Sequence, residues 1–480
     1  MAATERKSLE PWLLDSIAFY PHQIEGVRDL ARRNSFLLAD DMGLGKSLQA
    51  LTVFTVDVVR GWARTALVVA PVTLKGNWQD EIEKFTRFPA VVLNGTKAQR
   101  EKQIIDFVGI EGPKIMVVNY EQVVAHYDTL DALKFDVAIF DECHYLKNPK
   151  AKRTKACLSL YSRRSFMLTG TPMLNHVDEL WSILHRIDPK AYPKYWGFLN
   201  RYAVFGGYKD KQIVGVKNEK ELTERLQGVM LRRLKQDVLD LPDVQIIERR
   251  VDLLPQQRKL YDEVANEMRL PQPDGADPQD IENALTKFLR LKQICGTTLP
   301  FTGEDHSGKL DLATEDDLEL LENGHRLVVF TQFRDVQAAY AKRIAAMTNG
   351  DVPIFQLHGD IAQTERQPTV KTWSSTTTPG VIVCMLQVAG VGLNMVAARH
   401  GSFIDELFVP GLNKQAIDRL HRIGQNTTQP VQIRKYICRN TIENRVQQIL
   451  RTKSKLFGEI VESDPDWKRK LLKVMMEDEE

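Results

Sequence analysis

The fold of this chain is decided by the stretch Leu38-Ala39-Asp40-Asp41-Met42-Gly43-Leu44-Gly45-Lys46-Ser47. The apolar run 36–39 predicts a short buried strand, and leucines and valines then recur at helical spacing until about Gly61. Glycines let backbone N–H groups close around phosphate oxygens, and a helix N-terminus adds the positive end of its dipole. The stretch therefore predicts a phosphate-binding loop, although the strict pattern has a glycine where Asp40 stands.

Two side chains of this loop and two later ones carry the expected chemistry. Lys46 would reach the β- and γ-phosphates of a nucleotide as a point charge, and the Ser47 hydroxyl would hold Mg²⁺. The apolar run 137–140 ends in Asp141-Glu142-Cys143-His144. Asp141 would hold Mg²⁺, and Glu142 would orient and deprotonate the attacking water. Taken alone, the acidic pair is more typical of a surface cap, but the two stretches together predict a nucleoside triphosphatase.

The composition excludes several classes of protein. Apolar residues make up 43% and charged residues 27% of the 480 residues, which is typical of a protein with large buried cores. No apolar run approaches the roughly 20 residues of a membrane span, and the N-terminus lacks a signal-peptide layout, so we expect a cytoplasmic or nuclear protein. Five scattered cysteines argue against a disulfide framework and against zinc. The net charge of +2 is uninformative, because nucleic-acid binding needs only local positive potential.

Short apolar runs alternate with helical segments in both halves of the chain. The predicted strands after the loop are 66–70, 115–118, 137–140, 166–168, 327–330, 354–357, 381–385 and 431–436. Between about Asp178 and Leu320 the pattern is helical, with strand signal only in short pieces. We therefore expect an α/β protein with parallel sheets flanked by helices. Its parts would be a first lobe over 1–180, a helical insert over 181–320, a second lobe over 321–455, and a C-terminal helix and acidic tail over 456–480.

Three further stretches match one family together with the phosphate loop and Asp141–His144. They are Phe166-Met167-Leu168-Thr169-Gly170-Thr171-Pro172, Leu231-Arg232-Arg233-Leu234-Lys235-Gln236-Asp237-Val238 and Gln415-Ala416-Ile417-Asp418-Arg419-Leu420-His421-Arg422-Ile423-Gly424-Gln425. From about Tyr20 to Arg451 the chain resembles the Swi/Snf-type DNA-dependent ATPases of helicase superfamily two. The family implies two RecA-like lobes, with ATP and Mg²⁺ in the cleft between them and double-stranded DNA lying across both.

The resemblance also assigns roles to single residues. Gln23 resembles the glutamine that reads adenine, because its amide can donate and accept at once. The implied nucleotide contacts are Gln23, Met42, Gly43, Leu44, Gly45, Lys46, Ser47, Leu48 and Gly392. Arg419 and Arg422 resemble arginine fingers supplied by the second lobe, and we expect them on one helical face with Gln415, with Gly424 as the C-terminal cap. Hydrolysis would then need a closed cleft, and each cycle would shift the lobes along DNA.

The implied DNA contacts lie where strands end, in loops whose N–H and hydroxyl groups suit phosphates and do not read sequence. The candidates are Thr73, Lys75, Asn119, Tyr120, Thr331, Gln332, His358, Gly359, Gly390 and Asn394. For each of them taken singly, a purely structural role in a turn fits the sequence equally well.

The chain departs from the family pattern in places. Many members carry glutamine at Leu174, and most have Trp-Asn-Pro where this chain has Phe408-Val409-Pro410. The stretches 205–208 and 390–395 resemble a distant, fork-remodelling branch, and the small size suggests a bacterial or phage motor. We expect a DNA-stimulated ATPase that translocates on double-stranded DNA and remodels DNA or protein–DNA complexes. A strand-separating or fork-regressing helicase and an ATP-gated DNA clamp for a partner protein are the alternatives.

Overall fold

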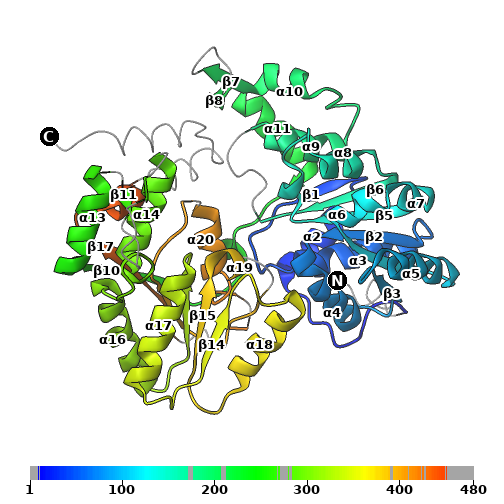
Figure 1. Ribbon diagram of the computed structural model, residues 1–480. Helices are drawn as coiled ribbons and strands as arrows, with labels where there is room; N and C mark the ends of the chain where they lie inside the picture. Colours follow the sequence, from blue (N-terminus) through cyan, green and yellow to red (C-terminus); the bar gives the residue numbers. More distant parts are fainter. Residues whose placement is uncertain are drawn as a thin grey trace. The chain divides into compact units, whose positions relative to one another are not determined.

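The computed structural model describes residues 9, 11–170, 177–206, 212–267, 269–270, 279–280, 284–389, 393–408, 410–422, 424–425, 429–448 and 450. The chain forms two compact units, and the division falls between Leu239 and Asp240. Figure 1 shows in each unit a twisted sheet with helices packed against it. Among the described residues, no helix is long and apolar enough to cross a membrane.

The first unit is built on a parallel sheet, in which the described residues form seven strands. Across the sheet these are β3 (Ala90–Val92), β4 (Lys114–Asn119), β2 (Thr65–Ala70), β5 (Phe135–Asp141), β6 (Ser162–Leu168), β1 (Phe36–Leu38) and β9 (Met230–Leu231). Every pair in this sheet is parallel, so the carboxyl ends of all its strands lie at one edge. The strands predicted for this half are confirmed, but the two edge strands, β3 and β9, were not predicted from the sequence.

Successive side chains of these strands enter two separate cores, because the pleat points them to opposite faces. Phe36 and Leu38 belong to the first core, which is covered by α2 (Pro21–Leu30), α3 (Lys46–Val59) and α4 (Lys75–Phe85). Leu37 belongs to the second. That core is covered by α5 (Lys97–Gly109), α6 (Tyr120–Ala125), α7 (Tyr127–Ala132), η2 (Cys143–Leu146), α8 (Lys152–Ser159) and α9 (Glu179–Ile187). A satellite core joins α9 to α10 (Tyr195–Tyr202), β7 (Ala203–Gly206), β8 (Gln212–Val216) and α11 (Glu219–Val229).

The second unit repeats this plan with six parallel strands among its described residues. Across the sheet they are β10 (Val244–Val251), β17 (Val431–Cys438), β16 (His400–Phe403), β13 (Leu327–Thr331), β15 (Val381–Met385) and β14 (Ile354–Leu357). One face is covered by α16 (Gly308–Glu322) and α17 (Arg334–Met347). The other is covered by α18 (Gln363–Ser375), α19 (Leu386–Ala389) and α20 (Pro410–Ile417).

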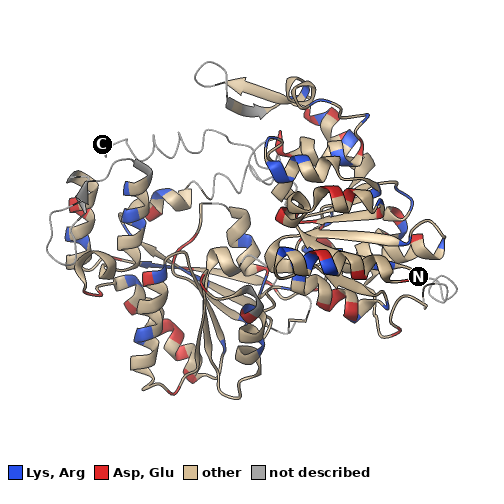
Figure 2. Cartoon of the chain, turned by 45° about the vertical axis from the view of Figure 1, so that its right-hand side comes forward, with Lys and Arg blue, Asp and Glu red and all other residues tan. Residues whose placement is uncertain are grey.

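A second satellite core belongs to this unit. It contains side chains from α13 (Pro255–Glu267), α14 (Ala284–Gly296), α15 (Leu299–Thr302), the end of β17 and the helical residues 442–448. Acidic and basic residues are interspersed over the helices of both units (Figure 2), as expected for helices that pack one face on a sheet and leave the other face polar.

The expectation that strand signal between 178 and 320 is confined to short pieces is wrong at β10. This strand is eight residues long and pairs along its whole length with β17, from Val244 opposite Val431 to Val251 opposite Cys438. It lies at the edge of the sheet and has no fully buried residue, so its sequence lacks the continuous apolar run of a central strand. The segment expected to form one insert is accordingly divided between the two units.

Candidate nucleotide site

The phosphate loop leaves the carboxyl end of β1 and enters α3, as the sequence predicts. Gly43 and Gly45 have φ angles of +86° and +76°, in the left-handed region that favours glycine. A Cβ on Gly45 would lie 2.4 Å from the side-chain nitrogen of Gln23. The Lys46 ammonium donates to the backbone oxygens of Asp40 (2.8 Å) and Asp41 (3.3 Å). The Lys46 side chain therefore lies along the loop, and its ammonium group contacts backbone oxygens of the loop.

Residues at the start of α2 are also directed at this loop. Gln23 Nε2 donates to the backbone oxygen of Leu44 at 3.2 Å, and its Oε1 accepts from the Tyr20 N–H at 3.1 Å. His22 Nε2 lies 3.2 Å from the same Leu44 oxygen, and burial lowers the pKa of His22. The structure thus brings the predicted adenine-reading glutamine against the phosphate loop.

Asp141, at the end of β5, is fixed by three neighbours. Trp78 Nε1 on α4 donates to Oδ2 at 2.8 Å, and the Glu142 N–H donates to Oδ1 at 2.9 Å. The Tyr120 hydroxyl on α6 donates to the Asp141 backbone oxygen at 2.7 Å. Burial and the Glu142 charge raise the pKa of Asp141 to about 7, against the hydrogen bond from Trp78 and the charge of Lys46.

Glu142 belongs to a polar triangle. Its φ of +49° is a left-handed conformation that is costly for a residue with a side chain and is common at functional sites. Glu142 Oε2 lies 3.1 Å from His144 Nδ1 and accepts from the Thr169 hydroxyl at 3.4 Å. His144 Nδ1 and the Thr169 hydroxyl are 3.3 Å apart. The carboxylate is therefore oriented by two side chains, His144 and Thr169, whose role was not predicted from the sequence.

Thr169 and Gly170 connect the carboxylates to the phosphate loop. They follow β6, which lies between β5 and β1 in the sheet. A Cβ on Gly170 would lie 2.8 Å from Met42 Cγ and 3.7 Å from Lys46 Nζ. Thr169 and Gly170 belong to the stretch 166–172, which resembles a family motif. The structure describes only its first five residues, so Thr171 and Pro172 lie outside the described residues.

The first unit's predicted DNA contacts have structural partners of their own. Lys75 is buried, and its ammonium donates to Leu93 O (2.5 Å), Asn94 Oδ1 (2.8 Å) and Gln122 Oε1 (3.5 Å). Burial lowers the pKa of Lys75 to about 8. This side chain points into the unit, where its ammonium binds protein oxygens and is not directed at a ligand.

The other three candidates of this unit differ from one another. Asn119 caps α6, where its side chain accepts from the Gln122 N–H at 2.7 Å. Tyr120 is fully buried, and burial raises the pKa of its hydroxyl. Thr73 lies half-buried in the short helix η1 (Val72–Leu74) and is the candidate most open to a ligand.

In the second unit, the side chains at the end of β13 are tied to Asp405. The Thr331 hydroxyl donates to Asp405 Oδ2 at 2.5 Å, and the Gln332 N–H donates to Oδ1 at 3.0 Å. His358 and Gly359 follow β14, and the Gly359 oxygen accepts from the Arg366 guanidinium at 3.2 Å. Asn394 is exposed, whereas Gly390 and Gly392 lie outside the described residues.

The expectation that Gln415, Arg419 and Arg422 share one helical face is wrong. Helix α20 ends at Ile417, before both arginines. The Arg419 N–H bonds back only three residues, to Ala416, and the Arg419 carbonyl accepts from Met395 at 3.1 Å. Gly424, with φ +99°, belongs to the turn that follows and does not cap the helix. Arg419 is 6% exposed and Arg422 is half-buried.

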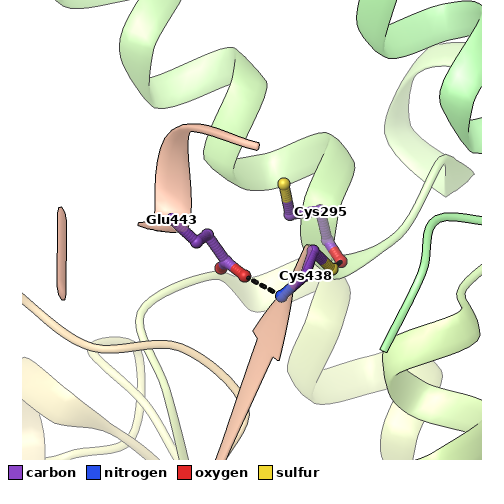
Figure 3. A group of neighbouring side chains, drawn as sticks. All are labelled: Cys295, Cys438 and Glu443. Carbon is purple, nitrogen blue, oxygen red and sulfur yellow. Dashed lines mark hydrogen bonds between the residues drawn. The ribbon is translucent and has the colours of Figure 1, made fainter. Parts of the chain in front are cut away.

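Cys295, Cys438 and Glu443 form a separate cluster in the second unit (Figure 3), with their ligand atoms within 4.8 Å of one another. Their surroundings do not suit a metal ion. Both Glu443 oxygens bind the buried Lys309 ammonium, at 2.5 and 2.7 Å, and one accepts from the Cys438 N–H at 2.9 Å. Burial raises the pKa of the Cys295 thiol well above its usual range. The cluster joins α14, β17 and residues 442–448.

Comparison with known proteins gives two family matches. The model of the SNF2-related domain matches residues 22–298, and the model of the helicase conserved C-terminal domain matches residues 312–424.

The relatives are longer proteins. A putative ATP-dependent helicase/translocase, YwqA, of Bacillus subtilis (strain 168) is 29% identical over 440 residues, which make up 89% of this chain and 46% of the relative. The TATA-binding protein-associated factor mot1 of Aspergillus fumigatus is 27% identical over 507 residues, covering 92% of this chain and 26% of the relative. The chain thus spans less than half the length of either. A solved Sulfolobus solfataricus SWI2/SNF2 ATPase core in complex with dsDNA is 27% identical, with coverages of 92% and 93% and a TM-score of 0.44.

Because the first family model alone matches more than half of the sequence, the chain belongs to the SNF2-related family.

Proposed function

We propose that the chain is an ATP-hydrolysing motor that is stimulated by double-stranded DNA and moves along it. The observation that carries the proposal is the arrangement in the first unit. A lysine-bearing phosphate loop and an Asp-Glu pair leave the carboxyl ends of β1 and β5. Thr169 and Gly170, which follow the intervening strand β6, lie against the Glu142 carboxylate and the phosphate loop, respectively. Membership of the SNF2-related family and the helicase or translocase names of its relatives support the DNA-dependent part.

The residues of this unit suit Mg²⁺ and a nucleotide. Mg²⁺ prefers hard oxygen ligands, and the Asp141 carboxylate and the Ser47 hydroxyl are of that kind. Each Asp141 oxygen accepts one hydrogen bond from a fixed donor, which leaves it lone pairs for a cation or its bound waters. The cation would neutralise phosphate charge when bound. Lys46 would contribute its ammonium and the loop its N–H groups to the β- and γ-phosphates, while Gln23 would hold the adenine.

Glu142 is the residue we assign to the chemical step. Its carboxylate accepts a proton from the attacking water, whose oxygen bonds to the γ-phosphorus as the bond to the β–γ bridging oxygen breaks, giving ADP and phosphate. Thr169 and His144 orient this carboxylate. Arg419 and Arg422 of the second unit are proposed to neutralise the charge that develops on the γ-phosphate.

The test is ATP hydrolysis measured without nucleic acid, with single-stranded DNA and with blunt double-stranded DNA, beside the Lys46→Ala variant. Strong stimulation by the blunt duplex, absent in the variant, is the expected result. Stimulation by single strands or forks alone would replace the proposal with a strand-separating helicase. Hydrolysis that no DNA changes would refute the DNA-dependent motor.

A further inference from the structure

Asp40 occupies the position at which the strict phosphate-loop pattern has a glycine. Its side chain is fully buried, and an isolated buried carboxylate is costly, so it needs a charged partner. That partner is Arg233, which lies 193 residues later in the sequence. The Arg233 backbone N–H and Nε each donate to Asp40 Oδ1 at 3.1 Å, and Nη2 donates to Oδ2 at 2.5 Å. The fork-like geometry is that of the strong bidentate arginine–carboxylate pair.

The same guanidinium holds the helices on either side of the loop. Arg233 Nη2 donates to Gln49 Oε1 on α3 at 2.6 Å, and Nη1 donates to the backbone oxygen of His22 on α2. Gln49 Nε2 in turn donates to Asp40 Oδ2 at 3.1 Å and to the Leu44 oxygen at 3.3 Å. Gly26 leaves room for this pair of side chains, since a Cβ there would lie 2.2 Å from Gln49 Oε1 and 2.7 Å from Arg233 Nη2.

The backbone around Arg233 runs beside the loop and is bonded to it. The Ala39 N–H donates to the Leu231 oxygen at 2.7 Å, and the Asp41 N–H donates to the Arg233 oxygen at 3.0 Å. Parallel pairing of β1 with β9 leads directly into these bonds. Arg232 adds weaker contacts, at 3.2 Å to the Ala39 oxygen and 3.4 Å to the Gly170 oxygen. Residues 39–41 are thus held by residues 231–233 along the edge of the sheet.

Residues 231–235, which contact the phosphate loop, lie close to the boundary between the two units. The first unit ends at Leu239, so residues 231–235 are part of the last stretch of chain before the second unit begins. We propose that Arg233 is a positioning residue, and that its ion pair with Asp40 makes the nucleotide affinity of the phosphate loop depend on the docking of this connecting segment. The inference rests on the proposed ATP-binding function. By linkage, nucleotide binding strengthens the docking of the segment by the same factor.

The experiment compares Arg233→Met, Arg233→Lys and the double variant Asp40→Gly/Arg233→Met with the wild-type chain. Arg201→Met is the matched control, because Arg201 pairs with Glu221 at the surface of the same unit. The probe is the fluorescent nucleotide methylanthraniloyl-ATP with Mg²⁺, supported by kcat and KM for ATP. Hydrogen exchange of peptides containing residues 39–41 and 231–235 reports the docking directly.

Arg233→Met is expected to raise the Kd for the probe and the KM for ATP by roughly 5- to 150-fold, the usual range of coupling between sites, while kcat changes little. Amides of residues 39–41 exchange faster in this variant, and nucleotide no longer protects 231–235. Arg233→Lys is intermediate, because an ammonium cannot make the forked contact. The double variant recovers most of the affinity, since it leaves no unpaired buried charge and restores the glycine.

Arg233→Met with the affinity and exchange of Arg201→Met would overturn the proposal, and so would a double variant as weak as the single one. If Arg233→Met fails to fold, the affinity for the probe and the hydrogen exchange of residues 39–41 are compared in Arg233→Lys and in the double variant instead. If the wild-type chain does not bind the probe, the proposed function fails. Hydrogen exchange of residues 39–41 in Arg233→Lys then still decides whether the Asp40–Arg233 ion pair holds the phosphate loop to residues 231–233.

Discussion

Trp78 is expected to control the Mg²⁺ dependence of hydrolysis, although it is not itself a ligand. Its indole N–H lies 2.8 Å from Asp141 Oδ2, and both groups are held in the first unit by buried strands and α4. Hydrogen bonds to charged groups contribute about 1.5–3 kcal/mol, and each 1.4 kcal/mol is about tenfold in an equilibrium constant. Trp78→Phe keeps an aromatic ring but removes the donor. The Mg²⁺ concentration for half-maximal activity should therefore rise by about 10- to 100-fold, the range typical of residues that orient metal ligands.

The assay is ATP hydrolysis at saturating ATP and duplex DNA over a wide range of Mg²⁺ concentration. Trp62→Phe is the matched control, because Trp62 is 50% exposed in the same unit and its ring lies against Arg60. A loss of packing at Trp78 would lower the unfolding temperature without moving the Mg²⁺ dependence, so both are recorded. Equal Mg²⁺ dependence in the two variants would show that Trp78 does not orient the carboxylate, and the reasoning would be refuted.

Four further substitutions test the nucleotide site and the buried Lys309–Glu443 pair. Lys46→Ala should abolish hydrolysis by removing positive charge from the phosphates, measured as phosphate release with and without duplex DNA. Glu142→Gln should bind ATP as tightly as wild type in a filter-binding assay yet should not hydrolyse it. Multiple turnovers by this variant would disprove the role of Glu142 as the base. Arg422→Ala should lower kcat on the order of 10³-fold with nucleotide binding retained, whereas near-full activity would remove it as an arginine finger. Lys309→Met should destabilise the second unit by about 3–5 kcal/mol, seen as a lower urea midpoint than in the exposed control Lys342→Met, because it leaves a buried carboxylate unpaired.

The central strands could be predicted because both faces of these sheets are covered. The sequences of such strands are continuous apolar runs, and residues 137–140 in β5 and 381–385 in β15 are examples. The strand β16, with the sequence His400-Gly401-Ser402-Phe403, gave no such signal, although it is fully buried. Its glycine lets other groups approach closely, since a Cβ on Gly401 would lie 2.9 Å from Ile433 Cδ1. An apolar pattern therefore reveals a buried strand whose own side chains are large and apolar. It misses a buried strand such as β16, where side chains of neighbouring segments occupy the space beside a glycine.

The sequence pattern predicted where the phosphate loop and the two carboxylates lie. It could not predict which way the side chains at the ends of the strands point. Lys75 and Tyr120 follow strands of the first sheet, as predicted, yet both side chains turn inward. The cause is buried acceptors from distant segments, namely the Leu93 oxygen for Lys75 and the Asp141 oxygen for Tyr120. The pairing of Asp40 with Arg233 is likewise invisible to spacing rules, because it joins segments far apart in the sequence.

Movement along duplex DNA, driven by this ATP site, can be measured as displacement of a third strand from a triplex at the end of a blunt duplex. Wild type and Glu142→Gln are compared in the presence of ATP and Mg²⁺. We expect ATP-dependent displacement by the wild-type chain, none by the variant, and an intact underlying duplex. A wild-type chain that hydrolyses ATP on duplex DNA but leaves the third strand bound would contradict movement along the duplex.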